Sequence, residues 1–258
     1  MKFWKKVAFA AAVIASGDHA HAADMSPTKA APFAPTLAAY SWTGFYAGIQ
    51  AGGQFSAFPL GGATSGAIAT VPGFGDPGVI GPSAVGFTGG LHAGFNYRFA
   101  PALVFGLEAD ASVGSINSSS SVTAVAAGVS NLFTVASAAS IPWKAEALAK
   151  LGVLVLPDVM LYGTGGASFA EIKQNSNLQS FLLPGGINGA FDDVHAGWAA
   201  GVGVDWAVNS HVIVGFRYLY EQWGTHGVIL ADPTLSSAYN ATMKAAANEI
   251  TGRVSFAF

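Results

Sequence analysis

The 258-residue sequence contains no cysteine, and only 10% of its residues are charged, against about 25% in an ordinary soluble domain. The lack of cysteine excludes disulfide frameworks, thiol catalysis and cysteine-ligated zinc. Eleven basic against fourteen acidic residues leave no basic surface, so nucleic acid is not an expected partner. Long hydrophobic runs are also missing. The best stretch, 148–162, is interrupted by Lys150 and Pro157-Asp158 and is shorter than the ~18 residues of a helical span.

Hydrophobic residues nevertheless make up 52% of the chain, the mean hydropathy is +0.45, and there are 33 glycines. This composition is typical of a membrane protein. The hydrocarbon of a bilayer accepts only helices and closed β-barrels, because other arrangements leave backbone N–H and C=O groups unpaired. By elimination, the sequence predicts a barrel.

The first residues predict export. Lys2, Lys5 and Lys6 precede an apolar run over 7–16, and Ala20-His21-Ala22 offers a cleavage site of the A-x-A type. Ten apolar residues are too few to span a bilayer, so the alternative to a cleaved signal is an interfacial anchor helix. The expected segments are a signal peptide over 1–22, a mature start at Ala23 or Asp24, a Pro/Ala-rich periplasmic lead-in over 23–40, and an outer-membrane barrel over 41–258.

Period-2 alternation supports the barrel directly, because one face of each strand meets lipid and the other meets the interior. In the first segment Phe45, Ile49 and Phe55 share one face, and Tyr46 and Gln50 share the other. Eight such segments are expected, over residues 45–55, 87–99, 103–113, 143–153, 159–171, 198–206, 212–221 and 249–258.

Charged residues test this register independently, because an Arg or Lys on the lipid face at mid-membrane costs about 2–4 kcal/mol. A soluble barrel shows the reverse pattern, apolar inside and charged outside. Within the expected strands, Glu171 is the one charged residue that is not expected on the inner face. It lies at an expected strand end, where the headgroups lie. The charges expected on the inner face, as a lumen charge network, are Arg98, Glu108, Asp110, Lys144, Glu146, Lys150, Asp205, Arg217, Glu221, Glu249 and Arg253.

Connections alternate between short and long, which is typical of outer-membrane barrels. The sequence therefore predicts an all-β fold, an eight-stranded antiparallel transmembrane β-barrel with short periplasmic turns and four long external loops. The short turns are 100–102, 156–158 and 207–211, and the loops are 56–86, 114–142, 172–194 and 223–247. The loops are expected to be irregular, apart from a short helical turn around 239–247.

Aromatic residues are expected in two belts at the membrane interfaces. The periplasmic belt comprises Trp42, Phe45, Phe99, Phe105, Trp206 and Phe258. The outer belt comprises Phe55, Phe87, Trp143, Phe169, Trp198 and Trp223.

The opening strand SWTGFYAGIQAG at 41–52 resembles that of the outer membrane immunogenic protein family, small porin-like surface barrels of Gram-negative bacteria. Segments GFTGGLHAGFNYRF (86–99), GWAAGVGVDWAV (197–208) and VGFRYLYEQWG (214–224) are similar to later strands of the family. The final ITGRVSFAF resembles the family's C-terminal assembly signal. The resemblance implies the barrel-assembly machinery and outer-membrane lipid as partners. The residues of that signal are Ile250, Val254, Phe256 and Phe258.

The leading hypothesis for function is a non-enzymatic surface protein with a structural or porin-like envelope role. Because an eight-stranded barrel is just wide enough for its own side chains, we expect the inner charges to pair and close it. One alternative is a narrow passive channel for small solutes. Another is recognition of a host surface, a phage or a neighbouring protein through the loops, whose apolar residues are Phe58, Phe74, Phe133, Phe181, Leu182, Leu183 and Tyr239.

Catalysis is the weakest interpretation. The candidate acid/base groups are His195 beside Asp192-Asp193, and His226 near Glu221. The six histidines show no H-x-x-x-H spacing, and the sequence has no Walker or dinucleotide fingerprint. We therefore expect no metal, no cofactor and no enzymatic activity.

Overall fold

The computed structural model describes residues 40–58, 60–65, 83–126, 129–180, 183–232 and 237–258. Contacts divide the chain into Met1–Leu37 and Ala38–Phe258, and every described residue belongs to the second unit. The predicted signal peptide and all of the lead-in except Tyr40 lie outside the described residues. Within the described part of the chain, no helix is long and apolar enough to span a membrane.

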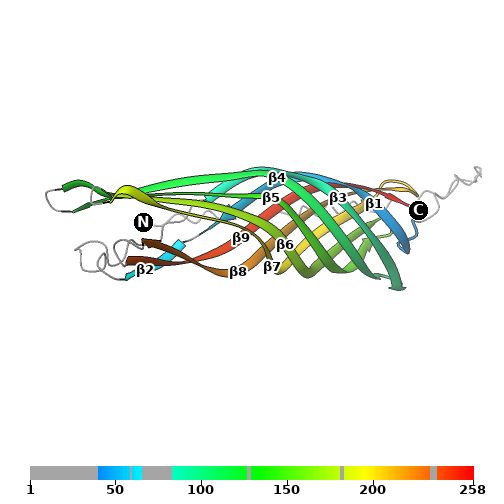
Figure 1. Ribbon diagram of the computed structural model, residues 1–258. Helices are drawn as coiled ribbons and strands as arrows, with labels where there is room; N and C mark the ends of the chain where they lie inside the picture. Colours follow the sequence, from blue (N-terminus) through cyan, green and yellow to red (C-terminus); the bar gives the residue numbers. More distant parts are fainter. Residues whose placement is uncertain (1–39, 59, 66–82, 127–128, 181–182, 233–236) are drawn as a thin grey trace, which may run out of the picture. The chain divides into compact units, whose positions relative to one another are not determined.

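The described strands form one antiparallel sheet that closes on itself, because β1 pairs with both β3 and β9 (Figure 1). From β3 to β9 each strand pairs with the next one in sequence, and β2 pairs with β9. The strands are β1 (Gly44–Ala57), β2 (Leu60–Ser65), β3 (Ser83–Ala100), β4 (Leu103–Ala126), β5 (Val129–Leu156), β6 (Val159–Ser180), β7 (Leu183–Ala207), β8 (Val212–Asp232) and β9 (Ser237–Ala257).

Strand β2 occupies the same position around the barrel as β1. Ala57 of β1 pairs with Ala246 of β9, and Leu60 of β2 pairs with Met243 in the same unshifted register. The nine strands therefore fill eight positions, which confirms the predicted eight-stranded antiparallel barrel.

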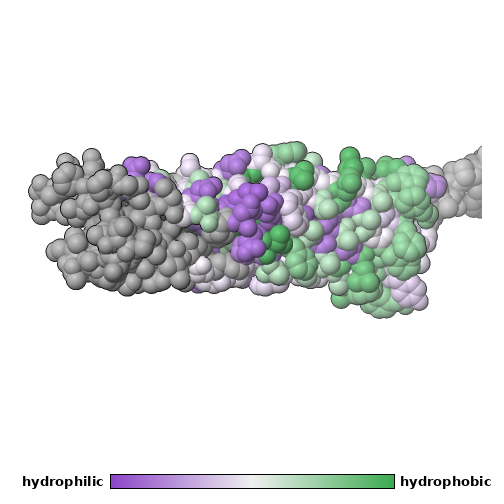
Figure 2. All heavy atoms as spheres, in the orientation of Figure 1, coloured by the Kyte–Doolittle hydropathy of each residue, from purple (hydrophilic) through white to green (hydrophobic). Residues whose placement is uncertain are grey.

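The predicted alternation is confirmed between the two aromatic belts. In β7, Val202 is exposed on the outer face while Asp205 is buried inside, and in β8, Phe216 is exposed while Arg217 is buried. On the face drawn in Figure 2, hydrophobic residues gather toward the end of the barrel that carries the short turns, and hydrophilic residues form a patch farther along the strands. The outer surface thus has the apolar band that lipid requires.

The expectation of long irregular loops is wrong for three of the four. Residues 114–126 and 129–142 form the ends of β4 and β5, paired as far as Ala126 and Val129. Strands β6 and β7 pair as far as Ser180 and Leu183, and β8 and β9 as far as Asp232 and Ser237. The expected helical turn around 239–247 is also wrong, because these residues belong to β9. Antiparallel pairing continues beyond the membrane, because it satisfies the backbone N–H and C=O groups there as well. We call these outer ends of β4 to β9 the extension.

Irregularities in pairing mark where the membrane barrel passes into this extension. The register shifts between Val113 and Ile116 in β4, between Ser140 and Lys144 in β5, and between Gln222 and Thr225 in β8. In β8 the shift coincides with Gly224, whose φ of 78° lies in the left-handed region that favours glycine at a bulge. Bulges of this kind are typical of barrel rims.

The aromatic belts differ from the expectation at two positions. Ten of the twelve residues are exposed on the outer face, but Trp42 and Trp223 are buried inside, each at most 1% exposed. Trp223 follows Arg217 and Glu221 by even steps in β8, so its side chain takes their inward direction. Trp42 stands two residues before β1 and shares the parity of inward-facing Tyr46.

Candidate functional site

The interior of the barrel holds a cluster of six charged side chains, which we call the lower cluster, at mid-membrane. Glu108 is at its centre: its carboxylate oxygens lie 2.9 Å from Arg217 Nη1, 2.8 Å from Arg253 Nη2 and 3.2 Å from Lys150 Nζ. Asp110 accepts from Arg217 at 2.8 Å, and Asp205 lies 3.3 Å from Lys150. The lower cluster contains three acidic and three basic groups, so its formal charges cancel.

Uncharged polar residues complete the lower cluster, among them Tyr46 and Gln50, which alternation predicts on the inner face. Tyr46 donates its hydroxyl hydrogen to Glu108 at 2.6 Å, and Gln50 accepts from Arg217 at 3.2 Å. The Lys150 ammonium lies 4.3 Å from the ring centroid of Tyr162, within the range of a cation–π contact. Each of these residues occupies an inward-facing strand position, as the buried charged residues do. This shared position in the alternation is the sequence signal that could have identified them.

A second group of charged side chains, which we call the upper cluster, lies nearer to the end of the barrel formed by the long hairpins β4–β5, β6–β7 and β8–β9. Lys144 Nζ lies 2.5 Å from Glu221, 2.7 Å from Glu249 and 3.1 Å from Glu146, and all four side chains are buried. One ammonium therefore faces three carboxylates. The acidic excess of the described interior is concentrated at this level.

Beyond the upper cluster lies an apolar layer. Trp223 donates its indole hydrogen to Ser168 Oγ at 3.0 Å, and Ser168 donates in turn to Glu221 at 2.8 Å, which ties the two levels together. Phe58, expected to be an exposed loop residue, is buried here because it continues the inward side of β1. The residues of this apolar layer are Phe58, Ala84, Ile116, Ala139, Ile141, Ala170, Ile172, Trp223, Ala245 and Ala247.

Trp42 fills the interior at the end with the short turns. Its indole N–H donates to the carbonyl of Pro157 at 3.0 Å, and its ring meets that of Tyr40 edge-on at a centroid distance of 4.9 Å. Trp42 also packs in a buried cluster with Val104 and Met160. The described interior is thus occupied by side chains at successive levels from one end of the membrane barrel to the other.

Two of the predicted charge positions are wrong. Arg98 is exposed rather than part of the interior network: its guanidinium donates to the carbonyls of Ala100 and Pro101 at the adjoining short turn. Its position at the end of β3, where the register shifts after it, releases the side chain from the inner face. The other ten predicted charges are buried inside. Glu171 does not end a strand, because β6 continues to Ser180.

Glu171 instead belongs to a small ionic group on the outer face of the extension. Lys173 lies 3.1 Å from Glu171 in the same strand and 2.8 Å from Asp192 in β7. Hydrogen bonding to Asp192 and Glu171 raises the pKa of Lys173, and the same bond to Lys173 lowers the pKa of Asp192. The Lys173 and Asp192 side chains are 42% and 55% exposed, and three outward-facing charges are consistent with a position beyond the lipid-facing band.

The structure separates one of the acid/base pairs that the sequence allowed. His195 is buried inside the barrel, whereas Asp192 is exposed and bound to Lys173. Asp193 is also exposed, although it shares the parity of His195 in β7. Glu221 is held by Lys144 and Ser168, and the side chain of His226 lies outside the described part. Among the described residues, no group of three or more His, Cys, Asp or Glu side chains is arranged to hold a metal ion.

A closed antiparallel sheet with a lipid-facing apolar band, two aromatic belts and inward charges defines a transmembrane barrel of the outer-membrane type. The chain belongs to the outer membrane protein beta-barrel domain family, whose model matches residues 29–258. It is 31% identical over 234 residues to the 31 kDa outer-membrane immunogenic protein of Brucella melitensis, which covers 88% of this chain and 91% of the relative. The same figures hold for the protein of that name from Brucella suis.

Among solved structures, the outer membrane protein OprG from Pseudomonas aeruginosa has the same kind of fold. The TM-score is 0.50 at 14% identity, with 85% of this chain and 99% of OprG covered. The predicted family resemblance and outer-membrane localisation are confirmed. The protein is an integral outer-membrane β-barrel related to the immunogenic surface proteins.

Proposed function

We propose that the protein serves as a non-catalytic structural barrel of the cell envelope whose interior is closed to free passage of solutes. The observation that carries this proposal is the sequence of occupied levels: Trp42 at one mouth, the lower and upper clusters at mid-membrane, and the apolar layer beyond them. Charged side chains that pair within an eight-stranded barrel leave little room for a water column.

Planar-bilayer recording tests the closed interior. Folded protein, identified by heat-modifiable gel migration, is expected to give no reproducible conductance steps, because each level in the barrel presents a desolvation barrier to ions. A known porin inserted from the same detergent serves as the control for insertion. Reproducible small steps from the folded protein would overturn the proposal.

Conductance steps would instead favour the alternative of a narrow passive channel. The ten inward charges comprise six acidic and four basic residues, with the acidic excess in the upper cluster. Such a channel should prefer cations, because rings of Asp and Glu attract them. A reversal potential measured in a salt gradient would reveal that preference.

The absence of catalysis is part of the proposal and rests on side-chain placement. A nucleophile or acid/base pair must lie within hydrogen-bond reach. The placement of Asp192 outside the barrel wall and of His195 inside it argues against their joint action. The remaining carboxylates at mid-membrane are engaged by Lys and Arg rather than aimed at a cleft.

We also propose that the end of β9 is recognised by the barrel-assembly machinery. Ile250, Val254, Phe256 and Phe258 all project from the outer face, where another protein can meet them before lipid does. Phe258 is 80% exposed and is joined to β1 by a backbone hydrogen bond to Phe45. Its side chain therefore contributes little to the packing of the finished barrel.

Deleting Phe258 is expected to abolish most assembly in cells while leaving refolding into detergent nearly unchanged, because the recognised side chain is lost and the barrel interior is untouched. The measurements are the amount of heat-modifiable protein in outer-membrane fractions and the refolded yield in vitro. Phe258→Tyr, which keeps the ring, is the matched control. Normal accumulation of the truncated protein in the outer membrane would contradict the proposed signal.

A further inference from the structure

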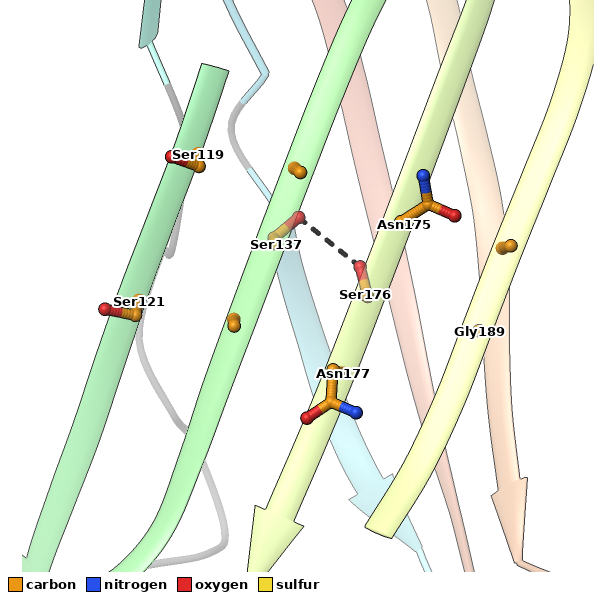
Figure 3. A pocket seen from close by; sticks show the side chains of 10 residues that line it. Ser119, Ser121, Ser137, Asn175, Ser176, Asn177 and Gly189 are labelled. Carbon is orange, nitrogen blue, oxygen red and sulfur yellow. Dashed lines mark hydrogen bonds between the residues drawn. The ribbon is translucent and has the colours of Figure 1, made fainter. Parts of the chain in front are cut away.

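The outer wall of the extension carries a trough that runs along β5 between β4 and β6. Strand pairing places its outward residues in three rows: Ser121–Ala136–Asn177, Ser119–Ala138–Asn175 and Asn117–Ser140–Lys173. In each row a small residue on β5 stands between longer polar side chains, and Figure 3 shows the serines of β4 and the asparagines of β6 on either side of that strand. The trough consists of two adjoining cavities. One, at the rows of Ser121 and Ser119, has a volume of about 550 Å³, and the other, at the row of Asn117, has a volume of about 320 Å³. Both are lined by Ser119, Ala138 and Asn175.

The floor of the trough is tied down from the inside. Behind β5 and β6, Ser137 and Ser176 approach each other at 3.3 Å, and Gln174 donates to Ser137 at 3.1 Å and to Ser176 at 3.3 Å. These three side chains are buried, so they fix the spacing of the two strands. A preformed groove loses less conformational entropy when a ligand binds.

The chemistry of the trough is polar and almost neutral. Its walls present hydroxyl groups and carboxamides, each of which both donates and accepts hydrogen bonds, as sugar hydroxyls do. The single cation, Lys173, is already paired with Glu171 and Asp192, and this group carries one net negative charge. A phosphate or carboxylate ligand would therefore meet no free positive charge among these residues, and an apolar ligand would leave the polar walls unpaired.

An extended peptide fits the trough less well than a sugar chain. Peptides commonly join a sheet by pairing with an open strand edge. At these rows, however, β5 is paired to β4 on one side and to β6 on the other, so its backbone offers no edge. Recognition has to proceed through side chains, which are neutral donors and acceptors.

The position of the trough indicates where a sugar chain would come from. Lys173, in the lowest row, follows the belt residue Phe169 by four residues, or about 13 Å of strand. The rows above it repeat at about 6.7 Å, two residues of strand each. The trough thus begins just beyond the lipid-facing band and extends away from the membrane.

From this geometry we propose that the trough binds the neutral saccharide chain of the glycolipid that surrounds the protein in the outer leaflet. The saccharide lies along β5, with its hydroxyl groups bonded to Ser119 and Ser121 on one side and to Asn175 and Asn177 on the other. The lipid part of the same molecule lies against the belt below. This inference does not depend on whether the barrel interior is closed.

Binding of lipopolysaccharide to the folded full chain in detergent tests the proposal, with lipid A, which lacks the core saccharide, as the comparison. Lipopolysaccharide that carries its core sugars is expected to bind at least about tenfold more tightly than lipid A, which corresponds to about 1.4 kcal/mol. A lipid-free oligosaccharide of uncharged sugars should also shift the side-chain amide NMR signals of Asn175 and Asn177 in a saturable way.

Ala138→Phe, which fills the exposed floor of the trough, is expected to remove both the preference for lipopolysaccharide over lipid A and the NMR shifts. Ala196→Phe places the same ring on the exposed outer face of β7, away from the trough, and should retain both. Heat-modifiable migration establishes that both variants are folded. Equal binding of lipopolysaccharide and lipid A, or an unchanged preference in folded Ala138→Phe, would overturn the assignment.

Discussion

Val202→Arg is expected to lower the free energy of unfolding in lipid vesicles by about 2–4 kcal/mol, because it places a charge on the lipid face at mid-membrane. Val202 is 61% exposed on the outer face of β7, midway between the belt residues Trp198 and Trp206. The folded protein must then either bury the guanidinium in hydrocarbon or thin the bilayer around it. Urea titration followed by tryptophan fluorescence measures the change.

The matched control is Ser119→Arg, which adds the same side chain to the same outer face but beyond the aromatic belt. Its cost is expected to stay below about 1 kcal/mol, because water and headgroups solvate the charge there. Gly203, on the inner face beside Val202, is unsuitable as a control: an added Cβ would lie 2.4 Å from the Tyr162 ring and 2.8 Å from the Phe216 carbonyl oxygen. Equal losses for Val202→Arg and Ser119→Arg would contradict the membrane position inferred from the belts.

Arg217→Met is expected to destabilise the barrel by about 3–5 kcal/mol, the cost of breaking a buried ion pair by removal of one partner. The substitution takes the guanidinium away from Glu108 and Asp110 and leaves Gln50 without its donor. Two cations then face three carboxylates in the lower cluster. The same urea titration applies, and Arg217→Lys should recover part of the loss because it restores the charge without the planar fork.

Arg98→Met provides the comparison for an arginine outside the interior. Arg98 is exposed and donates only to two carbonyls of the adjoining turn, so its replacement should cost less than about 1 kcal/mol. Sequence patterning placed both arginines on the inner face, and these variants separate the two placements experimentally. A loss at Arg98 as large as that at Arg217 would show that the lower cluster is not the stabilising feature we take it to be.

Removing Arg98 from the interior also changes its charge balance. The sequence predicts six acidic and five basic groups inside, whereas the structure places six and four there. The lower cluster is neutral, so the whole excess falls on the upper cluster, where Lys144 faces Glu146, Glu221 and Glu249. Any ion that enters from the side of the long hairpins meets this excess after the apolar layer.

The sequence by itself determined the strands between the two belts. Lipid on one side and a narrow interior on the other impose a strict alternation, so Phe216 and Arg217 could be assigned to opposite faces without coordinates. The same parity, carried two residues past Glu221, would have placed Trp223 inside. The prediction that Trp223 belongs to the outer aromatic belt was wrong because the expected belt was given more weight than the alternation.

The tertiary structure decided what lies beyond the membrane and which charges meet. In the extension the outer face is polar and the interior includes an apolar layer: Ile172 points inward between Glu171 and Lys173, which point outward. At these positions the hydrophobic residue faces inward and the charged residues face outward, which is the reverse of the membrane barrel. Strands recognised by their outward hydrophobic residues were therefore predicted only as far as the outer aromatic belt.

The partners of each interior charge also required coordinates. Arg217 meets Glu108 across 109 residues of sequence, and Lys150 meets Asp205 across 55. Parity gives only the face on which a side chain lies. The contacts depend on strand tilt and on the stagger between strands around the closed barrel, and both are fixed only when all eight positions are paired.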